Sequence, residues 1–296
     1  MYFWLNRDKK SGSLNNLYKV ADITKQGFAK KRKSSKSYKE EERYVIDIVS
    51  QVRVDHPTMS CRSIYYKMNP VFIGRDRFEN ICRQAGLKVV KQKNKKRTTD
   101  SSGVKRFPNL LKQVKDLNDI DQVWSSDITY FEVNGVFYYL TFILDNYSRR
   151  IVGHHISSRL LTAHTTLPAM NKAIKTRGKK LKQGIIIHSD GGGQYYADEF
   201  LDLTSKHKFR NSMCQYAWEN GKAERINGTI KNNYLKHWNV KTLQQLVKQV
   251  DRAVNLYNTD KPHISLERMT PVDFENKIAK LQKLQDQSQE VAISNN

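Results

Sequence analysis

Three carboxylates in the second half of the chain stand where an ionised side chain is costly unless it has a use. Asp127 lies inside "VWSSDITYFEV", and Asp190 follows an apolar run at residues 184–187 and precedes three glycines. Glu224 lies in "AWENGKAERINGTIK", whose apolar residues have helical spacing. If they converge, their oxygens form a hard site suited to Mg²⁺ or Mn²⁺. Two such ions, ~3.5–4 Å apart, clamp the attacking and leaving oxygens of an in-line phosphoryl displacement.

The third carboxylate has a rival in Glu219. On a continuous helix of about 3.6 residues per turn, Glu219 and Glu224 point roughly 140° apart, so both cannot face the aspartates. Glu224 shares an adjacent face with Asn227 and Lys231. Glu219 is close to the expected helix start, where an acidic side chain simply complements the helix dipole. We therefore favour Glu224.

The elements that must position these residues follow from the sequence pattern. Residues 123–131, 136–145 and 150–157 predict three consecutive antiparallel strands, with Asn134-Gly135 as a two-residue hairpin turn. A helix capped by Thr162 follows, then the apolar strand at 184–187 and a helix in "ADEFLDLTSKHK". A strand near "FRNSM" and a helix from Glu219 to about Trp238 complete the order βββαβαβα. This order predicts an α/β fold with a mixed sheet flanked by helices.

The front of the chain differs in charge and pattern. The net charge is +23, and the first 106 residues hold half of the 52 lysines and arginines but only about a third of the 29 acidic residues. Such a balance indicates a polyanionic partner, with nucleic acid ahead of an anionic membrane. "CRSIYYKMN" and "GRDRFENICRQAGLKV" predict two short helices, with Arg75 and Arg77 at the start of the second. They favour a helix-turn-helix-like DNA-binding unit over a plain helical bundle.

Other classes of protein fit the sequence less well. No apolar run approaches the ~18 residues of a membrane span, and the first residues do not resemble a signal peptide. The three cysteines are not spaced as metal ligands, which favours a reducing compartment. Trp124 and Trp218 are interpreted as packing residues rather than base-stacking platforms.

Several motifs together resemble a known family. "WSSDITY", "LDNYSRRIVG", "HSDGGGQY", "ENGKAERINGTIK" and the closing "LYNTDKPHISLERMTPVDF" are similar to the OrfB-type insertion-sequence transposases of the DDE superfamily, which includes retroviral integrases. The resemblance implies a ribonuclease H-like, mixed five-stranded sheet and a catalytic, metal-binding triad of Asp127, Asp190 and Glu224. The sequence departs from the family pattern in a slightly shorter interval between Asp190 and Glu224, and in Lys261 where arginine is usual.

The resemblance also implies a function, partners and an organisation of the chain. We expect a DNA transposase that uses two Mg²⁺ or Mn²⁺ ions for strand cleavage and strand transfer; the alternatives are a catalytically silent DNA-binding regulator derived from a transposase, and a nuclease without strand transfer. Its partners would be double-stranded DNA, further copies of the chain and an upstream-frame protein, in the bacterial cytoplasm at the nucleoid. The expected regions are 1–90 (helical, DNA-binding), 91–106 (basic linker), 107–275 (catalytic core) and 276–296 (polar tail). The expected DNA-binding residues are Lys231, Arg225, Lys222, His188, Gln194, Arg75 and Arg77.

Overall fold

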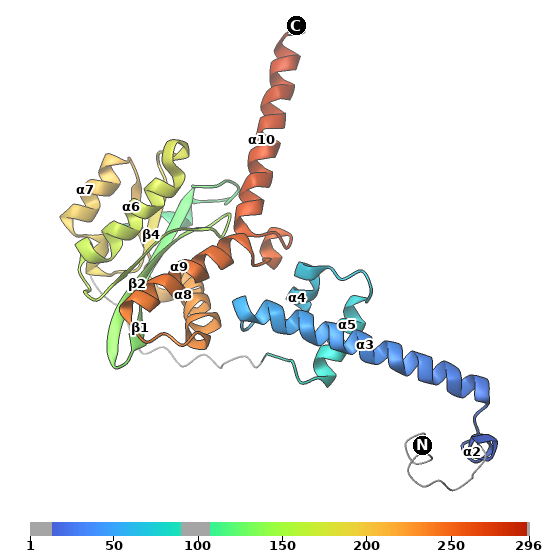
Figure 1. Cartoon of the computed structure of the whole chain (residues 1–296). Helices are drawn as coiled ribbons and strands as arrows, with labels where there is room; N and C mark the ends of the chain where they lie inside the picture. The colour runs from blue at the N-terminus through green and yellow to red at the C-terminus, as the bar shows by residue number, and fades with distance from the viewer. Residues whose placement is uncertain (1–13, 90–106, 295–296) are drawn as a thin grey trace.

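The computed structural model describes residues 14–89 and 107–294, and it contains a helical front unit and an α/β unit (Figure 1). The linker expected at 91–106 lies outside the described residues. In the front unit the helices are α2 (Leu14–Val20), α3 (Lys25–Asp55), α4 (Cys61–Met68) and α5 (Arg75–Gln84). The α/β unit contains the five strands and the helices α6 to α10. Across the described ranges, no helix is both long and apolar enough to span a bilayer.

The sheet of the α/β unit has the strand order β3-β2-β1-β4-β5. Strands β1 (Val123–Val133), β2 (Val136–Asp145) and β3 (Ile151–Ser157) form the predicted antiparallel meander. Strands β4 (Ile186–Ser189) and β5 (Arg210–Met213) extend the sheet in parallel with β1. Asn134 and Gly135 both have positive φ, 51° and 80°, as the predicted hairpin turn requires. The mixed five-stranded sheet is confirmed.

Two boundaries in this unit differ from the prediction. Strand β4 begins two residues later than expected, because Gly184 has φ 75° and its N–H donates to Lys208 O at 2.9 Å. The helix start predicted at Thr162 is wrong. Thr162 opens a short 3-10 turn, η2 (Thr162–His164), and α6 (Thr166–Arg177) begins after Thr165.

Helices cover both faces of the sheet (Figure 1). On one face, α6 and α7 (Asp198–Lys206) pack on a core around Trp124, Ile143 and Met170. Strand β3 approaches α6 so closely that a Cβ on Gly153 would lie 2.3 Å from Ala169 O. On the other face, α8 (Gly221–Asn233) and α9 (Leu243–Thr259) enclose a second core that includes Phe142. Asp127 pairs with Phe142 across β1 and β2, so both side chains share the α8 face.

The front unit has its own core, formed by the C-terminal part of α3 with α4 and α5; it includes Val49, Ile64 and Phe78. Helix α3 has 31 residues and ends at Asp55, two residues before Pro57. Thr24 caps α3 and Ser60 caps α4, each by accepting a backbone N–H. The helical region is present as predicted, while its helix-turn-helix assignment stays a prediction.

The front unit docks on the end of the α/β unit. His56 lies 3.0 Å from Tyr234 Oη through Nδ1 and 2.7 Å from Asp260 through Nε2. Lys67 on α4 also pairs with Asp260, and Arg268 stacks over the Tyr66 ring at 3.4 Å. These contacts place α4 against the connection between α9 and α10.

The last helix, α10 (Pro271–Ser294), begins at the sheet and extends away from it (Figure 1). Its first turn is fixed by Glu275, which accepts hydrogen bonds from Arg150 and Arg177. The segment expected as a polar tail is therefore helical through Ser294.

Candidate active site

Asp127 lies near the middle of β1, partly buried beneath α8. Asn227 on α8 donates from Nδ2 to Asp127 Oδ2 at 2.8 Å. Burial, followed by the charge of Asp190, raises the pKa of Asp127 to about 7. A buried carboxylate with a second carboxylate near it is harder to ionise, and a bound cation would relieve this cost.

Asp190 directly follows β4, the strand that is parallel to β1. Gly192 donates its N–H to Asp190 Oδ1 at 3.2 Å, and burial raises the pKa of this carboxyl group. A Cβ on Gly192 would lie 3.1 Å from both Asp190 Oδ1 and Gln194 Oε1, so the glycine lets the loop close tightly over the carboxylate. The sequence reasoning that placed a constrained carboxylate at a strand end is consistent with this geometry.

Glu224 belongs to the stripe of α8 that contacts β1. Asn220 Nδ2 donates to Ser126 O at 3.0 Å, and Lys231 Nζ donates to Thr129 Oγ1 at 2.5 Å. Glu224 and Asn227 lie between these two positions at helical spacing, so they share the stripe. Among the described residues, no three His, Cys, Asp or Glu side chains are grouped closely enough to hold a metal ion. The structure thus brings Asp127 and Asp190 together and puts Glu224 on the facing stripe, without ligand contact among all three.

Glu219 occupies a different position. It lies in a 3-10 turn, η5 (Ala217–Asn220), that precedes α8. Its Oε2 accepts the N–H groups of Gln215 at 2.5 Å and Tyr216 at 3.1 Å. Burial would raise the pKa of Glu219, but these backbone hydrogen bonds outweigh it and the pKa is lowered. Glu219 is therefore a capping residue of the loop, which leaves Glu224 as the acidic residue on the stripe that faces β1.

The expected DNA-contacting residues fall into three groups. Lys231 and Gln194 lie beside the aspartates, Lys222 and Arg225 lie on another face of α8, and Arg75 and Arg77 are in the front unit. Within their own unit, Arg75 pairs with Asp76 at 2.7 Å and Arg77 pairs with Glu41 at 2.8 Å. Gln194 donates from Nε2 to Leu160 O at 3.4 Å.

His188 does not fit the expected role. It is fully buried in β4, and its Nδ1 lies 3.0 Å from Ser212 Oγ on the neighbouring strand β5. Burial lowers the pKa of the imidazole to about 4, so His188 is neutral at physiological pH. A buried, neutral side chain inside the sheet is inaccessible to DNA, and we assign His188 a packing role instead.

The two tryptophans differ in their exposure to solvent. Trp124 is fully buried, as expected. Trp218 is 70% exposed and stacks on Tyr216, with ring centroids 4.4 Å apart and planes 3° from parallel. The packing interpretation of Trp218 is therefore wrong. The clue in the sequence is its place in a polar loop between a strand and a helix.

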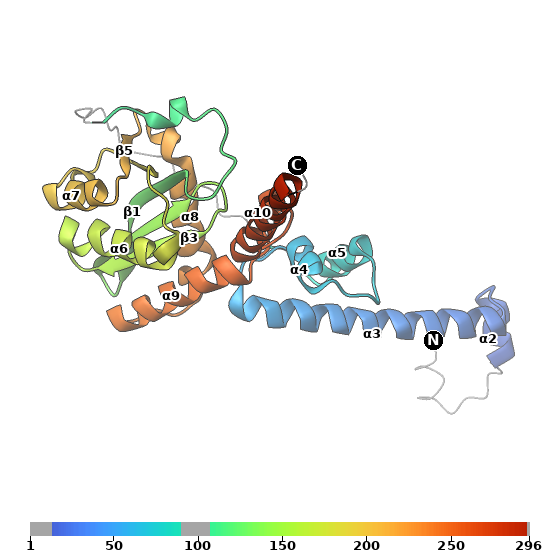
Figure 2. The same cartoon turned by 90° about the horizontal axis from the view of Figure 1, so that it is seen from above.

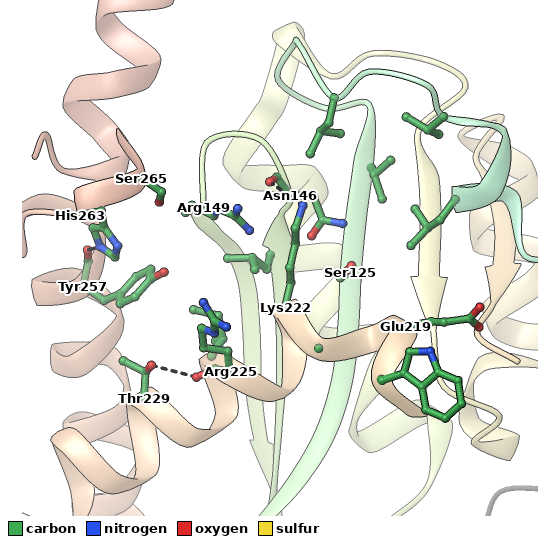
Figure 3. Close-up of a pocket in the computed structure, with 18 of the residues that line it drawn as sticks. Ser125, Asn146, Arg149, Glu219, Lys222, Arg225, Thr229, Tyr257, His263 and Ser265 are labelled. Carbon is green, nitrogen blue, oxygen red and sulfur yellow. Dashed lines mark hydrogen bonds between the residues drawn. The ribbon is translucent and has the colours of Figure 1, made fainter. Parts of the chain in front are cut away.

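Sequence reasoning also missed a basic cleft beside α8 (Figure 3). The cleft has a volume of about 660 Å³. Its lining includes Arg149, Lys222, Arg225, Lys261 and His263, and also Trp218 and Glu219. Glu219 lies toward one end of the cleft (Figure 3). Arg149 was not singled out in the sequence, and Lys261 was noted only as a departure from a family pattern.

Comparisons with known proteins bear on the α/β unit and beyond. An integrase core domain family matches residues 119–217, and a second family with the same description matches 206–271. The chain is 29% identical over 214 residues to the "Insertion element IS600 uncharacterized 31 kDa protein" of Shigella sonnei, which covers 71% of this chain and 77% of that protein. It is 27% identical over 174 residues to the transposase for insertion sequence element IS904 of Lactococcus lactis subsp. lactis, covering 57% of this chain and 66% of the relative.

Two further comparisons are more limited. A 105-residue segment is 33% identical to transposase InsF for insertion sequence IS3A of Escherichia coli, and covers 36% of this chain and 35% of that protein. Among solved structures, the HTLV-2 integrase catalytic core domain in complex with magnesium aligns with a TM-score of 0.43 and 21% identity, over 52% of this chain and 95% of that one.

Proposed function

The chain belongs to the insertion-sequence transposases of the integrase superfamily, and from this premise we propose that it cleaves DNA at the ends of a mobile element and joins the freed 3′-hydroxyl to target DNA. The observation that carries the proposal is the Asp127–Asp190 pair. Strands β1 and β4 are parallel neighbours with Ser125 opposite His188, so Asp127 and Asp190, each two residues further on, lie side by side, and the charge of Asp190 adds to burial in raising the pKa of Asp127. A regulator without catalytic activity would not need to maintain this costly arrangement.

The donor set fits a divalent cation. Asp127, Asp190 and Glu224 would hold Mg²⁺ or Mn²⁺, because all three offer carboxylate oxygens. Burial first, and the charge of Asp190 second, raise the pKa of Asp127, and a bound cation would offset both effects. When bound, two such ions would polarise the phosphodiester and stabilise the attacking and leaving oxygens. Asn227 orients Asp127 through its 2.8 Å hydrogen bond. Closure of Glu224 toward the aspartates would complete the ligand set.

Cationic and polar side chains around the carboxylates would bind the DNA backbone. Lys231 is on the same stripe of α8 as Glu224, and Gln194 follows the loop after Asp190. Lys222 and Arg225 would contact phosphates on the neighbouring face of α8. Arg75 and Arg77 at the start of α5 would add contacts from the front unit, and their ion pairs with Asp76 and Glu41 would open in exchange for phosphate.

Assembly and location follow from the same proposal. Joining two element ends to one target requires more than one active site in the complex, so we propose that several copies assemble on DNA. An upstream-frame protein or fusion would supply further DNA contacts. The chain would work in the bacterial cytoplasm, at the nucleoid.

The test uses the full chain with a duplex that carries its flanking element ends. With Mg²⁺, the wild type should cleave and join this duplex, and Asp190→Asn should lose cleavage while it keeps duplex binding. Glu224→Gln should reduce strand transfer by several orders of magnitude, and the matched variant Glu219→Gln should cost only a modest factor. Full cleavage by Asp190→Asn would refute the proposal, and the reverse order of the glutamates would show that the third residue is misassigned. Binding without cleavage by the wild type would favour the regulator.

A further inference from the structure

The basic cleft lies on a different side of α8 from the aspartates. Its walls are the first half of α8, the turn between β2 and β3, and the connection between α9 and α10 (Figure 3). Arg225 is about 100° from Glu224 and about 160° from Asn227 around the helix axis. Because Asn227 marks the direction of Asp127, the cleft and the carboxylate pair are separate sites on opposite flanks of one helix.

Four basic side chains converge on this cleft without an ion-pair partner. Within the described residues, none of Arg149, Lys222, Arg225 and Lys261 takes part in an ion pair. Lys222 Nζ reaches only a neutral acceptor, Asn146 O, at 3.3 Å, and Lys261 Nζ lies 5.6 Å from the centre of the Tyr257 ring. Glu219, the acidic residue of the lining, is already engaged by backbone N–H groups.

Buried arginines elsewhere in the fold have ion-pair partners. Arg177 contacts Asp121 at 2.8 Å and Glu275 at 2.8 Å, and Arg150 contacts Glu275 at 2.6 Å. Arg150 directly follows Arg149, which lines the cleft. Arg150 thus has an ion-pair partner, whereas Arg149 has none among the described residues. A partly buried guanidinium group without an ion-pair partner gains when an anionic ligand binds.

The basic side chains of the cleft also make it harder for one another to carry a positive charge. Burial and the charge of Arg149 lower the pKa of Lys222 to about 8. Burial also lowers the pKa of Arg149, with a further contribution from Arg225, and it lowers the pKa of Lys261. His263 is held neutral, with a pKa of about 4, by burial and by the charges of Lys261 and Arg149. Such repulsion is relieved when an anion enters.

We propose that this cleft binds the phosphodiester backbone of a DNA strand, at a site distinct from the Asp127–Asp190 pair. Arg149, Lys222, Arg225 and Lys261 supply the phosphate contacts. The lining also has an apolar part, formed by Leu111, Val114 and Leu117. A free inorganic anion would leave that part uncovered, whereas a DNA strand offers sugars and base edges to it. The inference rests on the proposed function only in taking DNA as the source of the phosphates.

The experiment measures duplex binding by the full chain in EDTA, across a series of salt concentrations, by fluorescence anisotropy. The cleft variant is Arg225→Gln with Lys261→Gln. The control is Lys175→Gln with Lys206→Gln, which removes the same charge from exposed positions on α6 and α7, on the other face of the sheet. A plot of log K against log salt has a negative slope, and each lost phosphate contact reduces the magnitude of this slope by about 0.9. The slope of the cleft variant should therefore be smaller in magnitude by about 1.8, and the control should keep the wild-type slope.

Further measurements separate the possible failures. The single variant Arg225→Gln alters an exposed side chain, so it should fold normally and show about half of that reduction. Inorganic phosphate at matched ionic strength should compete poorly with the duplex; competition equal to that of an oligonucleotide would reduce the cleft to an anion site and overturn the proposal. A wild-type slope in the double variant would also overturn it. The binding assay needs no cleavage, so Asp190→Asn should give the wild-type slope. Full cleavage by Asp190→Asn together with a wild-type slope would count against the proposed function alone.

Discussion

Replacing Glu275 with glutamine should destabilise the α/β unit, because this side chain neutralises two arginines at once. Glu275 is 8% exposed and is the fifth residue of α10. Its carboxylate accepts from Arg150 Nη1 at 2.6 Å, from Arg177 Nη1 and Nη2 at 2.8 and 2.9 Å, and from Ser148 Oγ at 2.7 Å. Glutamine preserves the shape and removes the charge, so the two guanidinium groups lose their shared partner.

The size of the effect follows from what Arg177 retains. Removing one partner of a buried ion pair costs about 3–5 kcal/mol. Arg177 keeps its 2.8 Å contact with Asp121, so we expect the lower end, about 3 kcal/mol. The matched control is Glu267→Gln, which breaks the Lys277–Glu267 pair between exposed side chains and should cost less than about 1 kcal/mol.

The assay is urea unfolding of the full chain at neutral pH. Hydrogen exchange is measured separately at the first turn of α10. Burial alone would raise the pKa of Glu275, but the hydrogen bond and charge of Arg177 lower it below its usual range. A lowered carboxyl pKa means that the stabilisation is present above the unfolded pKa and is lost as pH falls through the folded pKa. The gap between wild type and Glu275→Gln should therefore close in acid. A loss no larger than that of Glu267→Gln at neutral pH would refute the reasoning.

Three other predictions concern the sheet and its loops. Burial lowers the pKa of His188 to about 4, so the free energy of unfolding should fall as pH drops from about 6.5 toward 4. His188→Gln should remove about 3 kcal/mol of this pH dependence, measured by urea unfolding at each pH. An unchanged pH profile would contradict this prediction. Trp218→Ala should shift the unfolding free energy by less than about 0.5 kcal/mol and weaken binding of single-stranded DNA, whereas Trp124→Ala should cost about 3–5 kcal/mol. Gly153→Ala should lower stability by about 1–3 kcal/mol, because its Cβ would collide with Ala169 O on α6, and a neutral effect in thermal melts would show that α6 moves freely.

The first strands of the sheet could be predicted because local sequence determines their geometry. Asn134-Gly135 specifies a turn with two positive φ angles, and the alternating runs on each side fix the register of β1 and β2. The start of α6 was not readable. Thr162 and Thr165 have the same capping chemistry, and the turn is decided by Thr165 Oγ1, which donates to Leu161 O at 2.7 Å. The full length of α3 could not be predicted from apolar spacing, because its middle is almost entirely polar, although nothing there breaks a helix.

The candidate site was predictable to the extent that it lies on regular elements. Asp127 on β1, Asp190 at the end of β4 and Glu224 on α8 could be placed from strand and helix patterns. The cleft could not, because Arg149 owes its position to a turn in which it adopts φ 61°. Lys261 comes close to it only when the connection after α9 folds back, a long-range arrangement that no local pattern specifies.

The length of α3 gives the front unit a fixed reach. At about 1.5 Å per residue, its 31 residues span about 46 Å. Buried side chains occur only toward its C-terminal end, at Val45, Val49 and Val52, and the remainder runs outward to α2 (Figure 2). Along duplex DNA, with about 3.4 Å between base pairs, the same distance corresponds to about 14 base pairs. The helix therefore holds α2 about that far from His56, which contacts the α/β unit. An insertion of four residues in α3 would lengthen the helix by about 6 Å and turn its outer end by about 40°.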